Sequence, residues 1–109
     1  MKRLALITAL LSLFLSGFTV VLSGAEGSET KGKYYFKKTC KPCHKKKSEG
    51  PEISPLSKTT AQWAAIFASG NHANKQTLID IMDQEKLLHV STYLKAHASD
   101  SPQPETCGE

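Results

Sequence analysis

Two cysteines and a histidine lie within five consecutive residues, Cys40-Lys41-Pro42-Cys43-His44. Thiolate and imidazole groups are the softer ligands of proteins, and pairs of cysteines at this spacing hold metals, cofactors or disulfides. No other stretch of the 109-residue chain combines such groups. The fold must therefore present this cluster, and what the cluster holds is the first question that the sequence raises.

The first 25 residues have the pattern of a secretory signal peptide. Lys2 and Arg3 form a positive start, residues 4–22 are largely apolar, and residues 23–25 are the small residues that a signal peptidase reads. An uncleaved membrane anchor is the alternative, but several serine, threonine and glycine residues make this run a poor one. We therefore predict a periplasmic or otherwise exported chain with no membrane span after cleavage.

Cleavage would leave one short domain, residues 26–98, followed by a flexible C-terminal tail, residues 99–109. A chain of this size usually needs a disulfide framework, a metal or a cofactor to supplement its core. The chain has three cysteines, and Cys107 lies in the proline-rich tail. Because three cysteines cannot all pair within one chain, we do not expect a disulfide framework. Cys107 is then a free thiol or a bridge between two chains.

Positive charge is concentrated around the cysteine cluster. The formal net charge of +4 falls to +2 without Lys2 and Arg3, which is too small to indicate a nucleic-acid partner. Eight lysines nevertheless surround the cluster: Lys31, Lys33, Lys37, Lys38, Lys41, Lys45, Lys46 and Lys47. Such a face would attract a partner protein with an acidic docking surface, or it is simply solvated.

Two interpretations of the cluster fit the sequence poorly. A zinc site needs four ligands, usually from a second Cys/His pair, and His72, His89 and His97 do not form one. A thioredoxin-like redox pair needs an apolar strand before it and parallel strands after it. Residues 34–38 are too short and too charged for that strand, and no later segment alternates like one.

Covalent attachment of haem is the third interpretation, and we predict it. Cysteines at positions i and i+3 lie on one side of a helical turn, where both can form thioether bonds to one edge of a haem. The histidine that follows can then bind the iron. The apolar macrocycle would also supply the core that the chain is too short to build. We therefore predict one haem c, held through Cys40 and Cys43, with His44 as an iron ligand.

Three stretches around this motif carry a family resemblance. Gly32 is followed four residues later by Phe36, Gly50-Pro51-Glu52-Ile53 follows the motif, and residues 90–94 (Val-Ser-Thr-Tyr-Leu) lie near the end. Over residues 30–96 the chain thus resembles the class I c-type cytochromes. The resemblance implies an all-α fold, a small cytochrome c-like helical domain wrapped around one covalently attached haem.

The resemblance also implies roles for single residues. The carbonyl of Pro51 would accept the proton of the haem-ligating histidine, and Ile53 would stand where the family has a haem-contacting leucine. Gly32, Phe36 and Tyr93 would form the crossing of the first and last helices. A glycine has a physical reason to be there, since a missing side chain lets two helix backbones approach closely.

Two further helices are predicted after the motif. Residues 59–62 (Thr-Thr-Ala-Gln) form a capping box, and Gly70 ends the helix that it starts. Trp63 and the apolar residues three and four positions later share one face, which we expect to cover the haem. A lone tryptophan on such a face is, however, more often a core residue. Asp83 is expected to cap a helix that runs to about His97.

The predicted function is one-electron transfer by an exported monohaem cytochrome that is not an enzyme. The sequence shows no acid, base or nucleophile constellation. Iron with both axial positions filled by protein changes oxidation state without binding substrate. The alternatives are a haem-based enzyme or gas sensor with an open or weak sixth ligand, or a haem subunit of a larger electron-transfer complex.

The sixth iron ligand is predicted to be His72, with Met82 as the alternative. Met82 precedes the expected N-cap of the last helix, a position that packs on Leu87 as a hydrophobic staple. In the resembling family the distal ligand lies on a loop ahead of the last helix, and His72 lies in such a polar loop. His89 and His97 are expected to be structural or solvated. Two histidine ligands would give a low redox potential.

Overall fold

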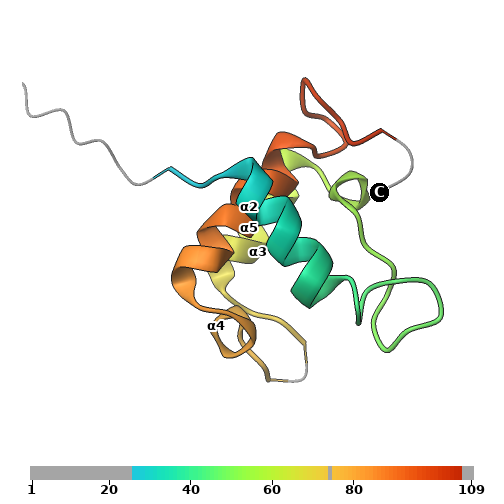
Figure 1. Ribbon diagram of the computed structural model, residues 1–109, viewed down its shortest axis with the longest axis vertical. Helices are drawn as coiled ribbons and strands as arrows, with labels where there is room; N and C mark the ends of the chain where they lie inside the picture. The colour runs from blue at the N-terminus through green and yellow to red at the C-terminus, as the bar shows by residue number, and fades with distance from the viewer. Residues whose placement is uncertain (1–25, 74, 107–109) are drawn as a thin grey trace, which may run out of the picture.

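The computed structural model of this protein describes residues 26–73 and 75–106, which form a small helical body (Figure 1). The predicted signal peptide and Cys107 lie outside the described residues. No helix among the described residues is long and apolar enough to cross a membrane. In chain order the elements are α2 (Glu29–Tyr35), the π-helical turn η1 (Phe36–Cys40), the 3₁₀ turn η2 (Pro55–Ser57), α3 (Thr60–Ser69), α4 (Leu78–Ile81) and α5 (Gln84–Ala96).

The prediction of an all-α fold is confirmed for the described residues. Pairing of extended backbone is confined there to one isolated bridge, between Asn71 and Thr77. The short helix α4 was not predicted from the sequence. It is a single turn that Thr77 and Asp80 stabilise as a capping box, and four residues are too few to show a helical period.

The ends of the two longer helices agree with the predictions. Thr59 is the N-cap of α3, where its side chain accepts a hydrogen bond from the N–H of Gln62. Gly70 ends this helix in the left-handed region, with φ of 69°, a conformation that glycine adopts without a steric penalty. Asp83 is the N-cap of α5, where it accepts a hydrogen bond from the N–H of Lys86.

The first helix carries the chain into the cysteine motif. Ser28 is the N-cap of α2 and accepts a hydrogen bond from the N–H of Lys31. The helix continues into η1, whose π-type bond joins the N–H of Lys41 to the carbonyl of Phe36 at 3.0 Å. Single π turns of this kind often accompany functional sites. Cys40 is the last residue of this widened turn.

The predicted crossing of the first and last helices is confirmed, because α2 and α5 pack directly on one another (Figure 1). Gly32 is buried at the crossing, and a Cβ atom added there would overlap the carbonyl oxygen of His89 in α5. The rings of Phe36 and Tyr93 pack with their centroids 5.8 Å apart. Both side chains are at most 2% exposed.

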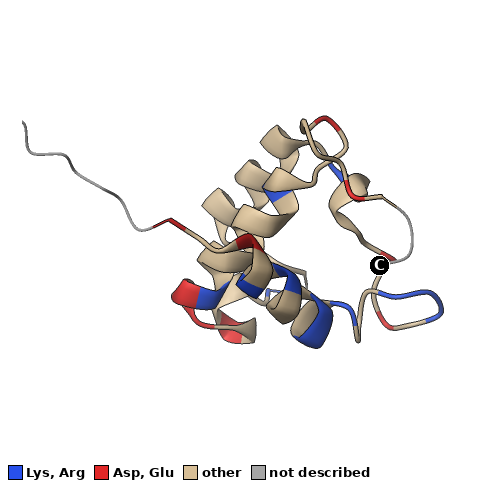
Figure 2. Ribbon diagram, turned by 45° about the horizontal axis from the view of Figure 1, so that its top comes forward, with Lys and Arg blue, Asp and Glu red and all other residues tan. Residues whose placement is uncertain are grey.

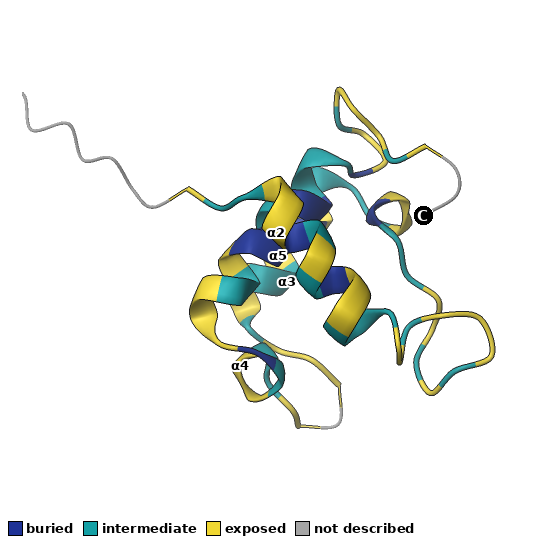
Figure 3. Ribbon diagram, in the orientation of Figure 1, coloured by how far each residue is buried: buried dark blue, intermediate teal, exposed yellow. Residues whose placement is uncertain are grey.

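The buried core is small and is centred on this crossing (Figure 3). Its members come from η1, α3, α5 and the residues that flank α5: Phe36, Trp63, Met82, Val90, Tyr93, Leu94 and Ala98. Half-buried side chains such as Ile53, Ile66 and Phe67 pack against it.

The described part of the C-terminal tail is bonded to α3 and to the segment before it. The carboxylate of Asp100 accepts hydrogen bonds from the N–H and hydroxyl of Thr60, at 2.7 and 2.9 Å. These bonds lower the pKa of Asp100. The N–H of Ser99 donates to the carbonyl of Lys58 at 3.2 Å. Residues 99 and 100 thereby tie the end of α5 to the beginning of α3.

We predict that Gly32→Ala destabilises the protein. In an exposed helix interior, glycine to alanine raises the free energy of unfolding by about 1 kcal/mol. Here the added Cβ would meet a carbonyl of α5, and forced overpacking of this kind costs roughly 1–3 kcal/mol. Urea unfolding should therefore show a lower midpoint for Gly32→Ala and little change for Lys31→Ala, an exposed position of the same helix. A Gly32→Ala protein as stable as the wild type would contradict the close approach.

Candidate haem site

A pocket of about 620 Å³ lies between η1, the loop after it, α3, α4 and α5. All eight residues that the sequence predicted for the haem site line it: Cys40, Cys43, His44, Pro51, Ile53, Trp63, His72 and Met82. Most of the remaining wall is apolar, including Phe36, Ile66, Phe67, Leu87, Val90 and Leu94. Cofactor pockets have volumes of about 300–1,000 Å³ and a mostly apolar lining, so this cavity suits a large apolar group.

The two cysteines lie three residues apart, at the two ends of one tight turn. The carbonyl of Cys40 accepts hydrogen bonds from the N–H groups of Cys43 and His44, at 3.2 and 3.0 Å. Both cysteines are free thiols, with Cys40 half-buried and Cys43 exposed. Burial, helped by the neighbouring Cys43, raises the pKa of Cys40 to about 11. The attacking cysteine of a thioredoxin-like pair has a lowered pKa instead, so this environment does not suit that chemistry.

The loop between Cys43 and Ile53 orients the imidazole of His44. Its Nδ1 lies 2.8 Å from the carbonyl oxygen of Pro51, which can only accept, so Nδ1 carries the proton and Nε2 keeps its lone pair. The carbonyl of His44 accepts a hydrogen bond of 3.1 Å from the N–H of Ile53. The carbonyl of Cys43 accepts one of 2.7 Å from the N–H of Gly50. The contact that the family resemblance implied between Pro51 and the histidine is therefore present.

Gly50 is required by the same loop. A Cβ atom added to it would lie 2.7 Å from both Nδ1 and Cε1 of His44. Cβ atoms do not approach other atoms so closely, so any side chain here would push the imidazole away from its present position. The glycine thus gives the ring of His44 the space in which it meets the Pro51 carbonyl.

His72 reaches the same pocket from the loop after α3. Its ring centroid lies 5.8 Å from that of His44, and the two ring planes are nearly perpendicular, at 88°. Because a metal–imidazole bond is about 2 Å long, two imidazoles on opposite sides of one metal ion have centroids roughly 6 Å apart. The Nδ1 of His72 lies 3.2 Å from Oε1 of Gln76, which leaves Nε2 without a hydrogen-bond partner among the described residues.

Met82 lines the pocket but also belongs to the buried core. It is 8% exposed and ends α4, where its N–H donates to the carbonyl of Leu78 at 3.2 Å. Leu87 packs against the same core, as the staple position of Met82 requires. The structural role predicted for Met82 is consistent with these contacts, and its place in the pocket keeps it as the alternative iron ligand.

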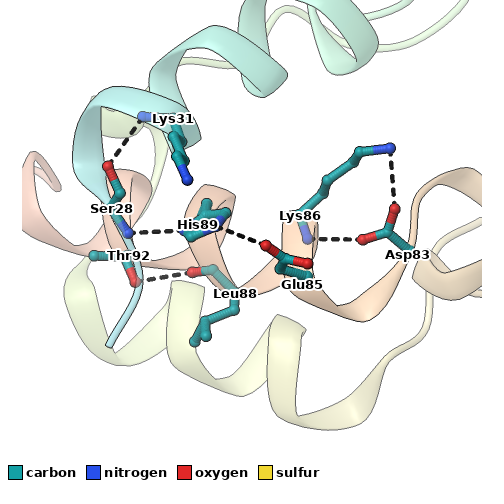
Figure 4. Close-up of polar contacts among 8 residues, drawn as sticks. All are labelled: Ser28, Lys31, Asp83, Glu85, Lys86, Leu88, His89 and Thr92. Carbon is teal, nitrogen blue, oxygen red and sulfur yellow. Dashed lines mark hydrogen bonds and ion pairs between the residues drawn. The ribbon is translucent and has the colours of Figure 1, made fainter. Parts of the chain in front are cut away.

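His89 and His97 do not line the pocket, and both have structural partners, as predicted. His89 is buried in α5, and its Nδ1 accepts a hydrogen bond of 2.8 Å from the N–H of Ser28 (Figure 4). Glu85, one turn earlier, approaches the other ring nitrogen of His89 at 3.9 Å. His97 contacts the carboxylate of Glu29 at 3.1 Å and the carbonyl of Gln103 at 2.9 Å. These two histidines hold Ser28, Glu29 and Gln103 against α5.

Trp63 faces the pocket as a core residue. Its side chain is 4% exposed, and its Nε1–H donates to the carbonyl of Pro55 at 2.9 Å. The indole N–H is therefore satisfied by the backbone and is not available to a ligand. Trp63 would contribute apolar surface to a bound haem.

The sequence interpretation missed five polar residues that line the pocket, Thr39, Glu52, Ser57, Lys58 and Gln76. Lys58 is the one lysine among the described lining residues, and its Nζ lies 6.0 Å from the centre of the Trp63 ring. Gln76 follows His72 by four positions in a polar loop. In a loop this spacing does not by itself predict that the two side chains meet. Only the backbone path brings Gln76 to the histidine.

The described residues fit a haem better than a bare metal ion. Among residues 26–73 and 75–106, no three His, Cys, Asp or Glu side chains are grouped so that they could hold a metal ion by themselves. The pocket instead offers two thiols on one turn, two imidazoles with Nε2 lone pairs, and apolar walls. A macrocycle with a metal at its centre would use all three features.

We predict that Gly50→Ala displaces the His44 ring. The substitution should remove the hydrogen bond to Pro51, because the new Cβ would occupy the space of the imidazole. Proton NMR should then show the Nδ1 proton of His44 exchanging faster with water, while Glu49→Ala, an exposed neighbour, leaves it unchanged. Equal exchange in Gly50→Ala and wild type would show that the loop adjusts without moving the ring.

No family model, no curated protein and no solved structure matches this chain.

Proposed function

We propose that this protein is an exported monohaem c-type cytochrome that carries single electrons between partner proteins and is not an enzyme. One observation supports the proposal most strongly. The rings of His44 and His72 lie with their centroids 5.8 Å apart and their planes nearly perpendicular, and both line an apolar pocket that both cysteines also line. Neither a thiol pair alone nor a histidine pair alone would need such a cavity, whereas a thioether-bound haem uses both.

Each group in the pocket has a role in this proposal. Cys40 and Cys43 would hold the haem through thioether bonds, and His44 and His72 would bind its iron through Nε2. When bound, the haem supplies one-electron chemistry, because its iron alternates between two oxidation states. The Pro51 carbonyl keeps Nδ1 of His44 protonated and makes Nε2 a better donor. The apolar walls would limit the contact of a bound haem with water.

A second candidate function has a specific observation in its favour. His72 is exposed and lies on a loop, whereas Met82 is buried beside the last helix. A ligand on an exposed loop can be displaced more easily than one in a packed core. The alternative is therefore a haem-based gas sensor or enzyme whose sixth ligand is weakly held. A haem subunit within a larger electron-transfer complex would use the same site as the carrier.

The partner surface that we propose is the basic loop, Lys45, Lys46 and Lys47. All three are exposed, directly follow the pocket residue His44, and have no ion pair within the described ranges. Figure 2 shows further lysines along α2 and η1. Lys33 among them is paired with Glu105 at 3.6 Å, and Lys38 donates to the hydroxyl of Tyr34 at 3.1 Å. The unpaired loop is thus the part best suited to an acidic partner.

Electron transfer to an acidic redox protein should slow as salt is added. Opposite charges steer such encounters at low ionic strength, and salt screens them. Stopped-flow measurement should give a second-order rate constant that falls roughly tenfold from low to high ionic strength. Changing Lys45, Lys46 and Lys47 to glutamine should flatten this dependence, while the matched change of the paired Lys33 should not. A rate constant that ignores salt in the wild type would exclude the loop as a docking site.

The proposed ligation predicts how the protein responds to carbon monoxide. Protein exported together with its haem should retain the haem after denaturation and lose it when Cys40 and Cys43 are changed to serine. The reduced wild type should keep its spectrum under carbon monoxide, as expected for a carrier with both axial positions filled. His72→Ala should admit carbon monoxide, whereas Met82→Ala should not.

Removing the buried Met82 side chain should lower the free energy of unfolding by roughly 2–5 kcal/mol.

Other outcomes of these spectra would change the interpretation. Rapid binding of carbon monoxide by the wild type would favour the sensor or enzyme. A near-infrared charge-transfer band of methionine ligation, present in His72→Ala and absent in Met82→Ala, would assign the sixth position to Met82. Protein that leaves the cell without covalent haem would remove the proposal altogether.

A further inference from the structure

We infer that Gln76 is a positioning residue for His72: its side-chain oxygen holds the imidazole in the tautomer and direction that present Nε2 to the pocket. This inference rests on the proposed function, because it concerns how the protein would hold its sixth iron ligand. It adds a residue that the cysteine motif and the family resemblance do not indicate. Three features of the loop carry it.

The first feature is the pairing of the backbone on the two sides of residue 74, residues 70–73 and 75–78. The N–H of His72 donates to the carbonyl of Gln76 at 2.9 Å, and the N–H of Gln76 donates to the carbonyl of Ala73 at 3.0 Å. The isolated bridge pairs residue 71 with residue 77, which is the register that sets residue 72 opposite residue 76. His72 and Gln76 therefore stay adjacent whatever their side chains do.

The second feature is the side on which these residues lie. Successive residues of an extended, paired segment point to opposite faces. His72 and Gln76 both line the haem pocket, whereas Asn71 and Thr77 line a second, open pocket beside α3 and α5. The two faces of the loop are thus separated, with the histidine and its glutamine together on the haem side.

The third feature is the hydrogen bond itself. An amide oxygen only accepts, so the contact of 3.2 Å between Nδ1 of His72 and Oε1 of Gln76 places the ring proton on Nδ1. Nε2 then keeps the lone pair that a metal requires. His44 has the same arrangement with the Pro51 carbonyl. Both imidazoles are therefore oriented through Nδ1, but only the acceptor of His72 is a side chain that substitution can remove.

A partner of this kind has two consequences for a metal ligand. It limits rotation of the ring, which strengthens binding, and its acceptor strength sets how much electron density Nε2 offers. Loss of such an outer partner typically weakens metal binding by about 10–100-fold. A carboxylate in place of the amide would accept more strongly and stabilise the oxidised metal. An apolar side chain of similar size would accept no hydrogen bond and would therefore favour the reduced metal.

Three variants of the complete haem-loaded protein test the inference. Gln76→Leu removes the acceptor at similar volume, and Gln76→Glu strengthens it. Asn71→Ala is the matched control, because this exposed residue lies on the opposite face of the same loop. In a potentiometric titration, Gln76→Glu should have a lower midpoint potential than wild type, and Gln76→Leu should have a higher one. The midpoint potential of Asn71→Ala should equal that of wild type. Reduced Gln76→Leu should bind carbon monoxide at least about tenfold more readily than wild type.

NMR of histidine labelled with nitrogen-15, in the reduced protein, provides a readout that does not depend on electron transfer. His72 should be protonated at Nδ1 in wild type and Gln76→Glu, and this proton should exchange faster in Gln76→Leu. Potentials and carbon monoxide binding that are equal in all three variants would overturn the inference. Loss of His72 ligation in both Gln76 variants alike would also overturn it, since the glutamine would then only stabilise the loop.

Failure of the proposed function is separable from failure of this inference. Wild-type protein without covalent haem, or His72→Ala with an unchanged spectrum, would exclude a haem ligand at His72 before any Gln76 variant is made. With His72 ligation established, only the behaviour of the Gln76 variants decides the positioning role.

Discussion

The close contact between α2 and α5 at Gly32 is the constraint on which the rest of the structure depends. A glycine at this point lets the backbone of α2 lie directly against the carbonyl of His89. The first helix continues from this contact into η1, which ends at Cys40, and Cys40 and apolar residues of α5 line the same pocket. Phe36 and Tyr93 extend the contact with aromatic surface. One wall of the pocket and its cysteines are therefore positioned by a helix crossing that contains no ligand.

The second constraint is the need to orient two imidazoles that approach from separate loops. His44 is held through a backbone carbonyl inside a loop that only a glycine at position 50 permits. His72 is held through the side chain of Gln76 on a loop that folds back on itself. The first arrangement is rigid and the second adjustable, because a side-chain acceptor can change without moving the backbone. Under the proposed function, a substitution at position 76 would change how the sixth ligand is held without altering the fifth.

Under the proposed function, the pocket would supplement the small buried core. The buried apolar side chains form one group around the crossing, and the pocket beside it is lined by further apolar residues such as Ile66 and Leu87. Filling this space with a covalently held apolar group would extend the core to α3 and α4. Polar contacts of His89 with Ser28 and of His97 with Glu29 join the beginning of α2 to α5.

The sequence by itself determined the local features of this protein. Local features act within one or two turns of a helix, so the sequence pattern predicts them directly. Thr59 and Asp83 as caps and Gly70 as a terminator indicate the ends of α3 and α5, and the spacing of Cys40 and Cys43 indicates one turn that holds both thiols. Tertiary structure decided what depends on distant contacts. The Ser28–His89 bond spans 61 residues and the Thr60–Asp100 bond spans 40, and no periodicity indicates either. Gln76 meets His72 only because the loop register pairs them, and register follows from backbone hydrogen bonds formed in the folded chain.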